Sequence, residues 1–233
     1  DILPIEMINK NISFSTSEFS SILNKIQGKS NFKLTEREVA QGIVADPDKA
    51  FMFDQSQDFN DNEKKLLKKY FTSVERYNTG KQRGLIAYLN KSEKFEIENL
   101  ANIKNQLLEY KKELKNRREV KNGRLNWFNL HWPRDERFFE NGAKIICGVR
   151  VKKPSFYYTE EEYYGSRALN FIKTERINLK YLAGILNSKL TFFWLKNRGK
   201  QLGDLLQVDK GPLLEIPIFV GDIKKQKEII DIV

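Results

Sequence analysis

The sequence predicts an α+β fold in which small twisted sheets, mixed or antiparallel, pack on helices, one of them long. Short apolar runs typical of strands are mixed irregularly with amphipathic stretches, without the regular strand–helix alternation of a doubly wound sheet. The longest amphipathic stretch, Glu96–Arg118, keeps apolar residues at steps of three and four, as one helix face requires. A hydrophobic fraction of 40% and an aromatic fraction of 12% in 233 residues are enough to build a core.

The helix expected at the centre of the fold covers Tyr181–Trp194. Asn178 is expected to cap its start, because a short amide side chain can accept a hydrogen bond from a free backbone N–H. Gly199 can end the helix in the left-handed conformation. Lys180 and Lys189 interrupt the apolar run, which argues against a membrane span. The apolar stripe that predicts burial against a sheet comprises Leu182, Ile185, Leu186, Leu190 and Phe193.

The N-terminal half is expected to begin with a helix near Glu18–Gln27. Two strand-like runs, Val39–Ala45 and Ala50–Phe53, then flank a turn at Asp46–Lys49. In this turn proline fixes φ and the aspartates can accept backbone hydrogen bonds. The pattern of two apolar runs around a short turn predicts a hairpin.

The remaining elements follow from shorter patterns of the same kinds. In chain order we expect a charged helix over Asn60–Phe71, a strand over Gly84–Leu89, the long helix over Glu96–Arg118, a strand over Lys144–Arg150, an extended segment over Lys152–Thr159, a strand over Ala168–Lys173, the central helix, a loop over Asn197–Gly211, an extended segment over Leu213–Ile218 and a helix from Asp222 onward.

The chain divides into three expected segments. Residues 1–34 form an N-terminal linker and helix, residues 35–220 form the main domain, and residues 221–233 form a truncated C-terminal helix. The last helix is cut short by the end of the sequence, and we therefore expect a fragment excised from a longer polypeptide.

Charge and composition narrow the classes of function. Lysine and arginine number 41 against 31 acidic residues, and the net charge of +10 favours a polyanionic partner. The only cysteine, Cys147, excludes an internal disulfide and a thiolate zinc site, and it is expected in a buried strand. The only histidine, His131, is expected to be structural or at the surface. No signal peptide or membrane-spanning stretch is visible, so we expect a cytoplasmic protein without membrane contact.

Motifs for catalysis are absent from the sequence. It contains no glycine-rich dinucleotide or phosphate loop, no G-x-S-x-G elbow and no Asn-Pro-Pro-Tyr motif of amino-methyltransferases. One metal-dependent nuclease pattern can be drawn from Asp48, Glu63 and Lys65, and it stays open as an alternative function. A second alternative is a protein-interaction module with the long helix as its docking surface. No catalytic or metal-binding residue is assigned.

The residue types fit recognition of nucleic acid better. Arginine reads the guanine edge with two hydrogen bonds, and lysine neutralises phosphate. Cations gather in the expected loops around 150–167 and 196–204, interleaved with tyrosines, for which packing at a strand edge is an equally good explanation. The candidate DNA-binding residues are Arg134, Arg137, Arg150, Lys152, Lys153, Tyr163, Tyr164, Arg167, Arg198, Lys200 and Gln201.

Four segments, in the right order, resemble the TaqI-like C-terminal specificity domain. The resemblance spans about residues 35–220. The segments are Gln41-Gly-Ile with Asp48-Lys-Ala-Phe51, the run Trp127 to Arg137 to Lys144-Ile-Ile, Tyr181-Leu-Ala-Gly-Ile-Leu-Asn-Ser-Lys-Leu190, and Glu215-Ile-Pro-Ile218.

The resemblance implies a target-recognition module for double-stranded DNA. Such modules belong to adenine-specific DNA methyltransferases and to type IIG restriction-modification enzymes, some of which also cut DNA. It implies that S-adenosylmethionine is bound, and adenine N6 methylated, by an N-terminal methyltransferase domain of the same polypeptide. It implies no cofactor and no active site in this chain. The base-reading residues vary between family members, so the resemblance transfers none of them.

Overall fold

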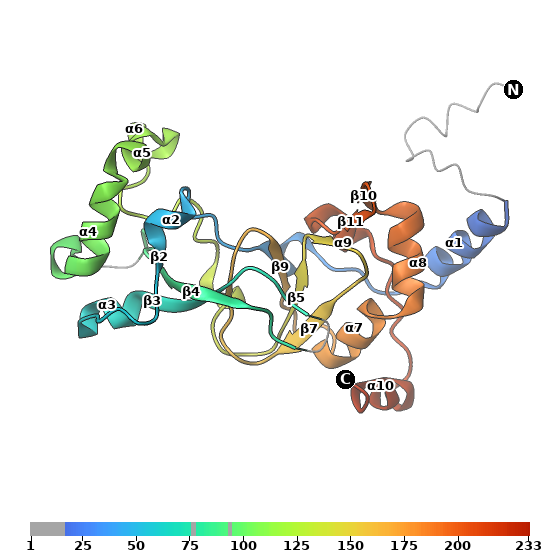
Figure 1. Cartoon of the computed structure of the whole chain (residues 1–233). Helices are drawn as coiled ribbons and strands as arrows, with labels where there is room; N and C mark the ends of the chain where they lie inside the picture. The colour runs from blue at the N-terminus through green and yellow to red at the C-terminus, as the bar shows by residue number, and fades with distance from the viewer. Residues whose placement is uncertain (1–16, 76–77, 93–94) are drawn as a thin grey trace, which may run out of the picture.

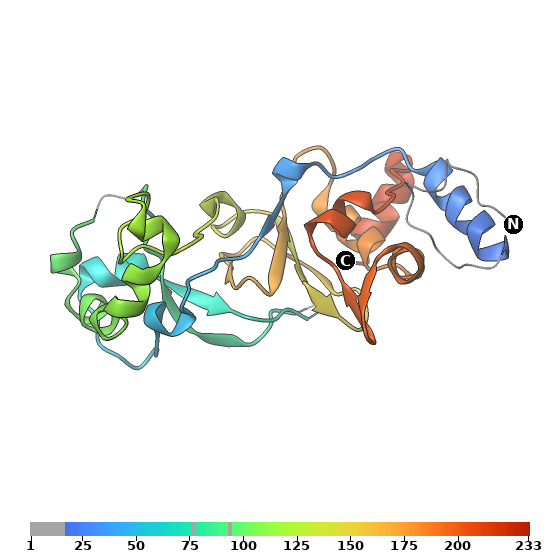
Figure 2. The same ribbon diagram turned by 90° about the horizontal axis from the view of Figure 1, so that it is seen from above.

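The chain forms an elongated α+β molecule with helices at both ends and small sheets between them (Figure 1). The computed structural model describes residues 17–75, 78–92 and 95–233. Seen from above, the same elements form one long body, with α4 at one end and α1 at the other (Figure 2). The α+β class expected from the sequence is confirmed. Within the described residues, no helix is both long and apolar enough to span a membrane.

Three sheets form the middle of the molecule. The first has the strand order β1-β9-β5-β7, the second β10-β11-β6, and the third β2-β4-β3-β8. All the pairings are antiparallel except that of β3 with β8, among the named strands. The strands are β1 Val39–Gln41, β2 Met52–Phe53, β3 Leu67–Phe71, β4 Gln82–Ala87, β5 Lys144–Gly148, β6 Arg150–Val151, β7 Phe156–Thr159, β8 Tyr164–Gly165, β9 Leu169–Ile172, β10 Lys200–Leu202 and β11 Leu205–Gln207.

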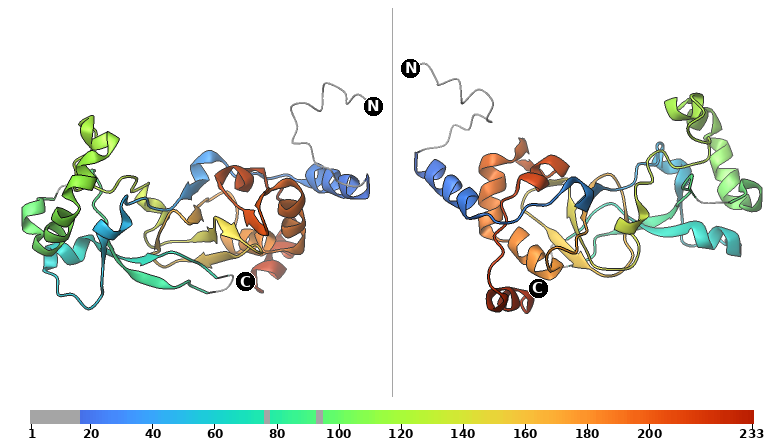
Figure 3. Two further views of the ribbon diagram at one scale, coloured as in Figure 1. Left: turned by 45° about the horizontal axis from the view of Figure 1, so that its top comes forward. Right: turned by 180° about the vertical axis from the view of Figure 1, so that it is seen from behind.

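The helices occupy the two ends, and Figure 3 shows this arrangement from two further sides. The 3-10 turns are η2 Glu36–Glu38, η3 Ile97–Asn99 and η4 Glu136–Phe138. The α-helices are α1 Ser17–Lys29, α2 Asp48–Phe51, α3 Asp61–Leu66, α4 Ala101–Glu109, α5 Lys111–Asn116, α6 Arg118–Lys121, α7 Leu179–Leu186, α8 Lys189–Arg198, α9 Lys210–Glu215 and α10 Ile223–Ile230.

Two hydrophobic clusters lie on opposite faces of the first sheet, and its strands contribute side chains to both. Side chains alternate between the two faces of a strand. In β5, Ile145 and Cys147 therefore join one cluster and Ile146 joins the other. In β9, Phe171 and Ile172 divide in the same way. The sheet thus links the two ends of the molecule through its own core residues.

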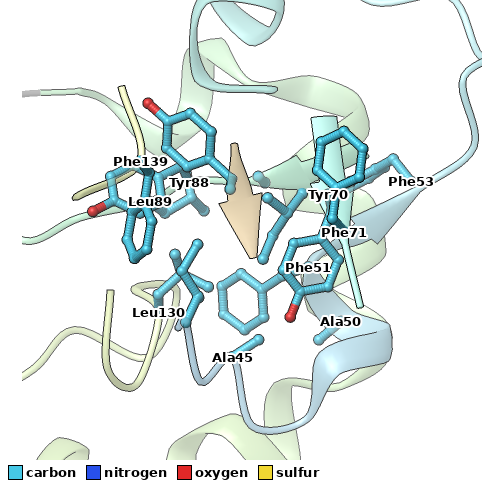
Figure 4. Close-up of a cluster of buried hydrophobic side chains, with 14 of the residues drawn as sticks. Ala45, Ala50, Phe51, Phe53, Tyr70, Phe71, Tyr88, Leu89, Leu130 and Phe139 are labelled. Carbon is cyan, nitrogen blue, oxygen red and sulfur yellow. The ribbon is translucent and has the colours of Figure 1, made fainter. Parts of the chain in front are cut away.

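The first cluster lies around the third sheet and α4. Phe51, Tyr70 and Leu130 are all fully buried in it. Figure 4 shows these side chains closing on one another from β3, from α2 and from the segment that follows α6. The second cluster lies under α7 and α8, where Leu182 and Leu186 pack toward β5 and β7. Both clusters are contiguous apolar cores of the kind that stabilise a domain.

The central helix differs from its prediction. Asn178 caps its start as expected, since its side chain accepts hydrogen bonds from the N–H groups of Lys180 and Tyr181. The helix then breaks after α7, and Ser188 caps a second helix, α8, by accepting from the N–H of Thr191. A serine side chain offers the backbone an alternative partner, which favours a new start. Gly199 follows α8 at φ −78°, so the expected left-handed end is wrong.

The long helix is also interrupted. Instead of one helix over 96–118, the chain forms η3, α4, α5 and α6. Arg117 is extended at φ −60° and ψ 138°, and its guanidinium donates to the carbonyls of Trp127 at 2.7 Å and Asn129 at 2.9 Å. These buried bonds tie the helix end to the following loop. The spacing of apolar residues over 96–118 could not predict these hydrogen bonds, because the carbonyls that accept them belong to residues outside that stretch.

Three further expectations about secondary structure are wrong: a hairpin, a helix and an extended segment. β1 pairs with β9, so the runs around Asp46–Lys49 do not form a hairpin with each other. Within 60–71, only α3 is helical, and β3 follows because Tyr70 and Phe71 enter the third sheet. Much of Leu213–Ile218 lies in α9 rather than in an extended segment. In each case a long-range strand pairing or packing contact overrides the local pattern.

Other local expectations are confirmed. The helix expected near 18–27 is α1, and Cys147 lies buried in β5, where burial raises the pKa of its thiol to about 12. The division at residues 35 and 220 stays a prediction. Leu23, which precedes residue 35, and Ile229, which follows residue 220, both pack with the second cluster.

Candidate nucleic-acid interface

Three of the expected arginines line two adjoining hollows on the surface. The first hollow has a volume of about 420 Å³ and contains Arg134, and the second has a volume of about 500 Å³ and contains Arg150 and Arg167. Gln41 and Asp209 line both of them. We call the pair the arginine hollows. The fold therefore gathers three cations that are well separated in the sequence.

Arg134 enters the first hollow from a strained turn. Its backbone lies at φ 69°, a left-handed value that is uncommon for a residue with a side chain. Its Nε donates to the carbonyl of Gly42 at 3.3 Å, and its Nη2 donates to Oε1 of Gln41 at 3.4 Å. Partial burial lowers the pKa of the Arg134 guanidinium, which still stays protonated at neutral pH. These bonds fix the direction of the side chain.

Arg167 lies in the exposed turn between β8 and β9. This turn comes so close to β1 that a Cβ atom on Gly42 would lie 2.1 Å from the carbonyl oxygen of Ser166. Glycine is therefore required at position 42. The side-chain amide of Gln41 donates to the carbonyl of Arg167 at 2.9 Å. The strand that borders Arg134 thus also holds the turn that carries Arg167.

Arg150 belongs to a three-stranded sheet that carries further cations. It pairs with Gln207 of β11, and β11 forms a hairpin with β10 that turns at Gly203, where φ is 59°. In β10, Lys200 and Gln201 are exposed. Lys152 and Lys153 follow β6 and are also exposed. This second sheet therefore presents a basic edge beside the second hollow.

The β3–β4 hairpin supplies the opposite wall. Thr72, Ser73 and Val74, at the end of β3, line the second hollow together with Arg150 and Arg167. Seen from above, this hairpin and the β10–β11 hairpin lie along the same edge of the molecule (Figure 2). The second hollow is thus bounded by two hairpins that come from opposite ends of the chain.

Four of the expected residues lie elsewhere or are engaged differently. Arg137 is exposed but forms an ion pair with Asp135 at 2.8 Å and donates to the carbonyl of Arg37. Nε of Arg198 is buried and has no hydrogen-bond partner within the described part of the chain. Tyr163 and Tyr164 are each only 2% exposed.

The two tyrosines are held by the core. The hydroxyl of Tyr163 donates to the carbonyl of Ser73 at 2.8 Å, and that of Tyr164 donates to Oε1 of Glu136 at 2.5 Å. Burial is the first cause that raises the pKa of both phenols. Because neither ring reaches the surface, we leave both out of the interface proposed below.

Several residues that line the hollows are not among the DNA-binding residues predicted from the sequence. Gln41, Ser73 and Gln207 are uncharged, and Lys210, at the start of α9, was not selected although it is a cation in the expected loop. Two of these residues carried a signal: Lys210 by its charge and loop position, and Gln41 because it belongs to one of the segments that resemble the specificity domain. Selection by charge and loop position finds arginines and lysines, but it cannot find amides that become neighbours through strand pairing.

The alternative nuclease site does not have the surroundings that a metal ion needs. Glu63 is fully buried, and its carboxylate accepts backbone hydrogen bonds from Asn102 at 2.7 Å and from Ile103 at 3.1 Å. It is therefore part of a helix junction. Among the residues that the structure describes, no group of three His, Cys, Asp or Glu side chains could hold a metal ion.

His131 has a structural environment, as expected. Its Nε2 lies 2.9 Å from Oε2 of Glu119, its Nδ1 lies 3.2 Å from Oδ2 of Asp46, and its ring stacks on Trp132. These contacts connect α6 to the turn before α2. Nε2 is hydrogen-bonded to Glu119, whereas Nδ1 is buried near Asp46 without a hydrogen-bond partner among the described residues.

The arginine hollows do not fit S-adenosylmethionine. They are lined by the cations Arg134, Lys210, Arg150 and Arg167 and by the carboxylates Asp135 and Asp209. With a sulfonium, an ammonium and a carboxylate this cofactor is positive overall, so a lining with a surplus of cations disfavours it. The same lining attracts phosphate groups.

Comparisons with known proteins point to one family. The profile of the TaqI-like C-terminal specificity domain matches residues 93–218, which is more than half of the chain. Two curated relatives are the type II methyltransferases M.HincII and M.HindII of Haemophilus influenzae. Each is 31% identical to this chain over an alignment of 104 residues, and the alignment covers 40% of this chain and 21% of M.HincII or 20% of M.HindII. The chain therefore matches about a fifth of the length of these relatives.

Two solved structures share the fold. The type IIL restriction-modification enzyme MmeI, solved in complex with DNA, aligns with 87% of this chain and 27% of its own, at a TM-score of 0.62 and 13% identity. The type IIG restriction endonuclease BpuSI aligns with 92% of this chain and 28% of its own, at a TM-score of 0.54 and 10% identity. At these identities the similarity concerns the fold.

Proposed function

The chain belongs to the TaqI-like C-terminal specificity domain family, and from this membership we propose that it recognises a specific sequence in double-stranded DNA. The observation that carries the proposal is the grouping of Arg134, Arg150 and Arg167 around the arginine hollows. Three cations from separate parts of the sequence converge there. A face of this kind provides both charge for phosphates and planar donors for base edges.

Within this face we assign two roles. Arg134, Arg150 and Arg167 line the hollows, where a guanidinium can meet a guanine edge with two hydrogen bonds. Lys152 and Lys153 are exposed beside β6 and suit phosphate contacts, which set the register of the protein on the duplex. Lys200 and Gln201, exposed in β10, extend the same basic edge, whereas Arg137 and Arg198 are left out of the interface.

We further propose that the whole protein is an adenine-N6 DNA methyltransferase, with endonuclease activity if it is of the type IIG class. In this proposal residues 35–220 form the recognition domain. A preceding methyltransferase domain binds S-adenosylmethionine, and the reaction takes place there. The methyltransferase relatives support the use of S-adenosylmethionine by a catalytic domain of the whole protein. A cytoplasmic location is part of the same proposal.

The test separates the two roles by mutation. Lys152→Ala/Lys153→Ala should weaken binding to all duplexes alike and reduce the slope of log K against log salt by about 2, because each lost phosphate contact removes about one unit. Arg150→Ala/Arg167→Ala should relax the sequence preference, which selection from a random duplex library measures. The matched control is Arg118→Ala/Arg124→Ala, two exposed arginines at the far helical end.

The control should bind with the preference of the wild type and lose no more affinity than its change in net charge explains. A wild-type protein whose binding is insensitive to salt, or which enriches no sequence from the library, would overturn the proposal. If the control lost selectivity as strongly as Arg150→Ala/Arg167→Ala, the assignment to the arginine hollows would be wrong.

A further inference from the structure

Gln41 connects Arg134 with the turn that carries Arg167. Its Oε1 accepts a hydrogen bond from Nη2 of Arg134 at 3.4 Å, while its Nε2 donates to the carbonyl of Arg167 at 2.9 Å. It also lies between the two hollows, since it lines both. One carboxamide therefore bridges the guanidinium of Arg134 and the backbone of Arg167, which come from different loops.

The backbone around Gln41 is fixed by strand pairing. Gln41 is opposite Asn170 in the β1–β9 ladder, and the N–H of Gly42 donates to the carbonyl of Leu169 at 2.9 Å. The side chain of Asn170 is buried and donates to the carbonyl of Val208 at 2.6 Å. A shift of this register would turn Gln41 to the other face of the sheet. The direction of its side chain is therefore determined by the core.

The carboxamide is engaged on both sides. A glutamine that reads adenine needs its donor and its acceptor at the same time. In Gln41 one N–H is donated to the backbone carbonyl of Arg167 and Oε1 accepts from Arg134, so the carboxamide is oriented by the protein rather than by a base. Nη1 of Arg134, in contrast, has no hydrogen-bond partner among the residues that the structure describes, so its N–H groups are available to a ligand in the hollow. The geometry favours Gln41 as the support and the arginines as the readers.

We propose that Gln41 is a positioning residue for sequence selectivity, and this inference rests on the DNA-recognition function proposed above. Gln41 sets the placement of Arg134 relative to Arg167 and thereby determines which pair of base edges the two guanidinium groups can reach. It does so without contacting DNA. The residue lies outside the part of the chain that matches the family profile, which begins at residue 93.

The experiment compares selection from a random-sequence duplex library by the wild type and by Gln41→Met, which keeps the length of the side chain and removes both hydrogen bonds. The enrichment of the wild-type sequence should fall about tenfold, the scale of one lost bidentate contact. Affinity for a non-specific duplex and its salt slope should stay unchanged, because no charge is altered. The control is Gln57→Met, an exposed glutamine outside the hollows.

A double-mutant cycle distinguishes positioning from a general structural role. In an Arg134→Met background, Gln41→Met should reduce enrichment much less than it does in the wild type, because its effect through Arg134 has already been removed. Independent effects that simply add would overturn the proposal. If Gln41→Met does not fold, Gln41→Glu keeps the acceptor for Arg134 and removes the donor to Arg167. Its preferred sequence, rather than its affinity, is then compared with that of the wild type.

Failure of this inference differs from failure of the proposed function. A wild type that enriches no sequence would remove the function itself. A wild type that selects a sequence, together with a Gln41 variant that selects the same sequence equally well, would remove only the positioning role. A changed sequence with an unchanged salt slope is the result that supports it.

Discussion

At the scale of single residues, Glu38 gathers donors from two distant parts of the chain. Nη2 of Arg176 donates at 2.6 Å and its Nε at 2.7 Å, the hydroxyl of Thr174 donates as well, and the backbone N–H of Thr35 donates at 2.7 Å. Arg176 is the largest cause, and these bonds outweigh burial and lower the pKa of Glu38 from 4.5 to about 2. The carboxylate therefore fastens the segment before β1 to the segment after β9.

We expect Glu38→Gln to remove an acid-sensitive part of the free energy of unfolding. A carboxylate with a lowered folded-state pKa contributes stability that is complete above the unfolded value of 4.5 and is lost as pH falls toward about 2. The wild type should therefore lose about 1–2 kcal/mol more than Glu38→Gln between roughly pH 6 and pH 3. Urea denaturation at a series of pH values measures this difference.

Glu36→Gln is the matched control. Glu36 is exposed, and its ion pair with Lys210 at 2.6 Å lies at the surface, where such pairs contribute little. Its acid dependence should follow that of the wild type. An acid dependence of Glu38→Gln as steep as that of the wild type would show that other carboxylates dominate.

At the scale of secondary structure elements, Glu63 joins α3 to α4. Its carboxylate completes a capping box with Asn60, which donates its backbone N–H at 3.0 Å. It also accepts from the free N–H groups of Asn102 and Ile103 in the first turn of α4. Burial by itself would raise the pKa of Glu63, but these hydrogen bonds outweigh it and the pKa is lowered. One buried charge thus satisfies donors of two helix starts.

Glu63→Ala should lower the free energy of unfolding by about 3 kcal/mol, because buried backbone donors lose a charged acceptor. Glu63→Gln should cost less, since one oxygen remains. Asp61→Ala, an exposed change in the same helix, is the control and should cost little. DNA affinity per folded molecule should stay unchanged in all three.

The same variant tests the nuclease alternative. Magnesium-dependent DNA cleavage by the wild type that disappears in Glu63→Ala would support that alternative.

At the scale of the whole molecule, β5 and β9 connect the two hydrophobic clusters. Ile145 packs in the second cluster and Ile146 in the first, and both are fully buried. The arginine hollows lie along the same region, where β1, β6 and the turn before β9 meet. If one cluster unfolded, β5 and β9 would be exposed on one face, and the other cluster would lose the strands against which it packs.

We therefore expect one cooperative unfolding transition. Two proteins with a single tryptophan report on the clusters separately, since Trp127 packs against the first and Trp194 lies in the second. Their urea midpoints should coincide. Ile145→Ala and Ile146→Ala should each lower the free energy of unfolding by about 2–5 kcal/mol. Each should therefore shift both urea midpoints to lower concentration by the same amount. A variant that lowered only one midpoint would show that the clusters unfold independently.

The sequence predicted the elements whose signals are local. Asn178 caps α7, Cys147 is buried in β5, and the strand over 169–172 lies close to its expected position. The breaks at Ser188 and Arg117 were missed, because their causes are a side-chain cap and buried hydrogen bonds to a distant loop. Of the candidate site, the charges of Arg134, Arg150 and Arg167 were found, whereas the amide of Gln41 was not.

By itself, the sequence determined the fold class, the basic character of the chain and its resemblance to a specificity domain, because composition, apolar periodicity and short motifs are carried by neighbouring residues. Only the tertiary structure decided which cations share a surface and which aromatic residues are buried. Tyr163 and Arg167 are close in sequence, yet strand pairing places the first in the core and leaves the second beside a hollow. Tyr163 stacks on Phe71 and its hydroxyl donates to the carbonyl of Ser73, whereas Arg167 lies in the turn between β8 and β9, and both sets of contacts come from distant parts of the chain.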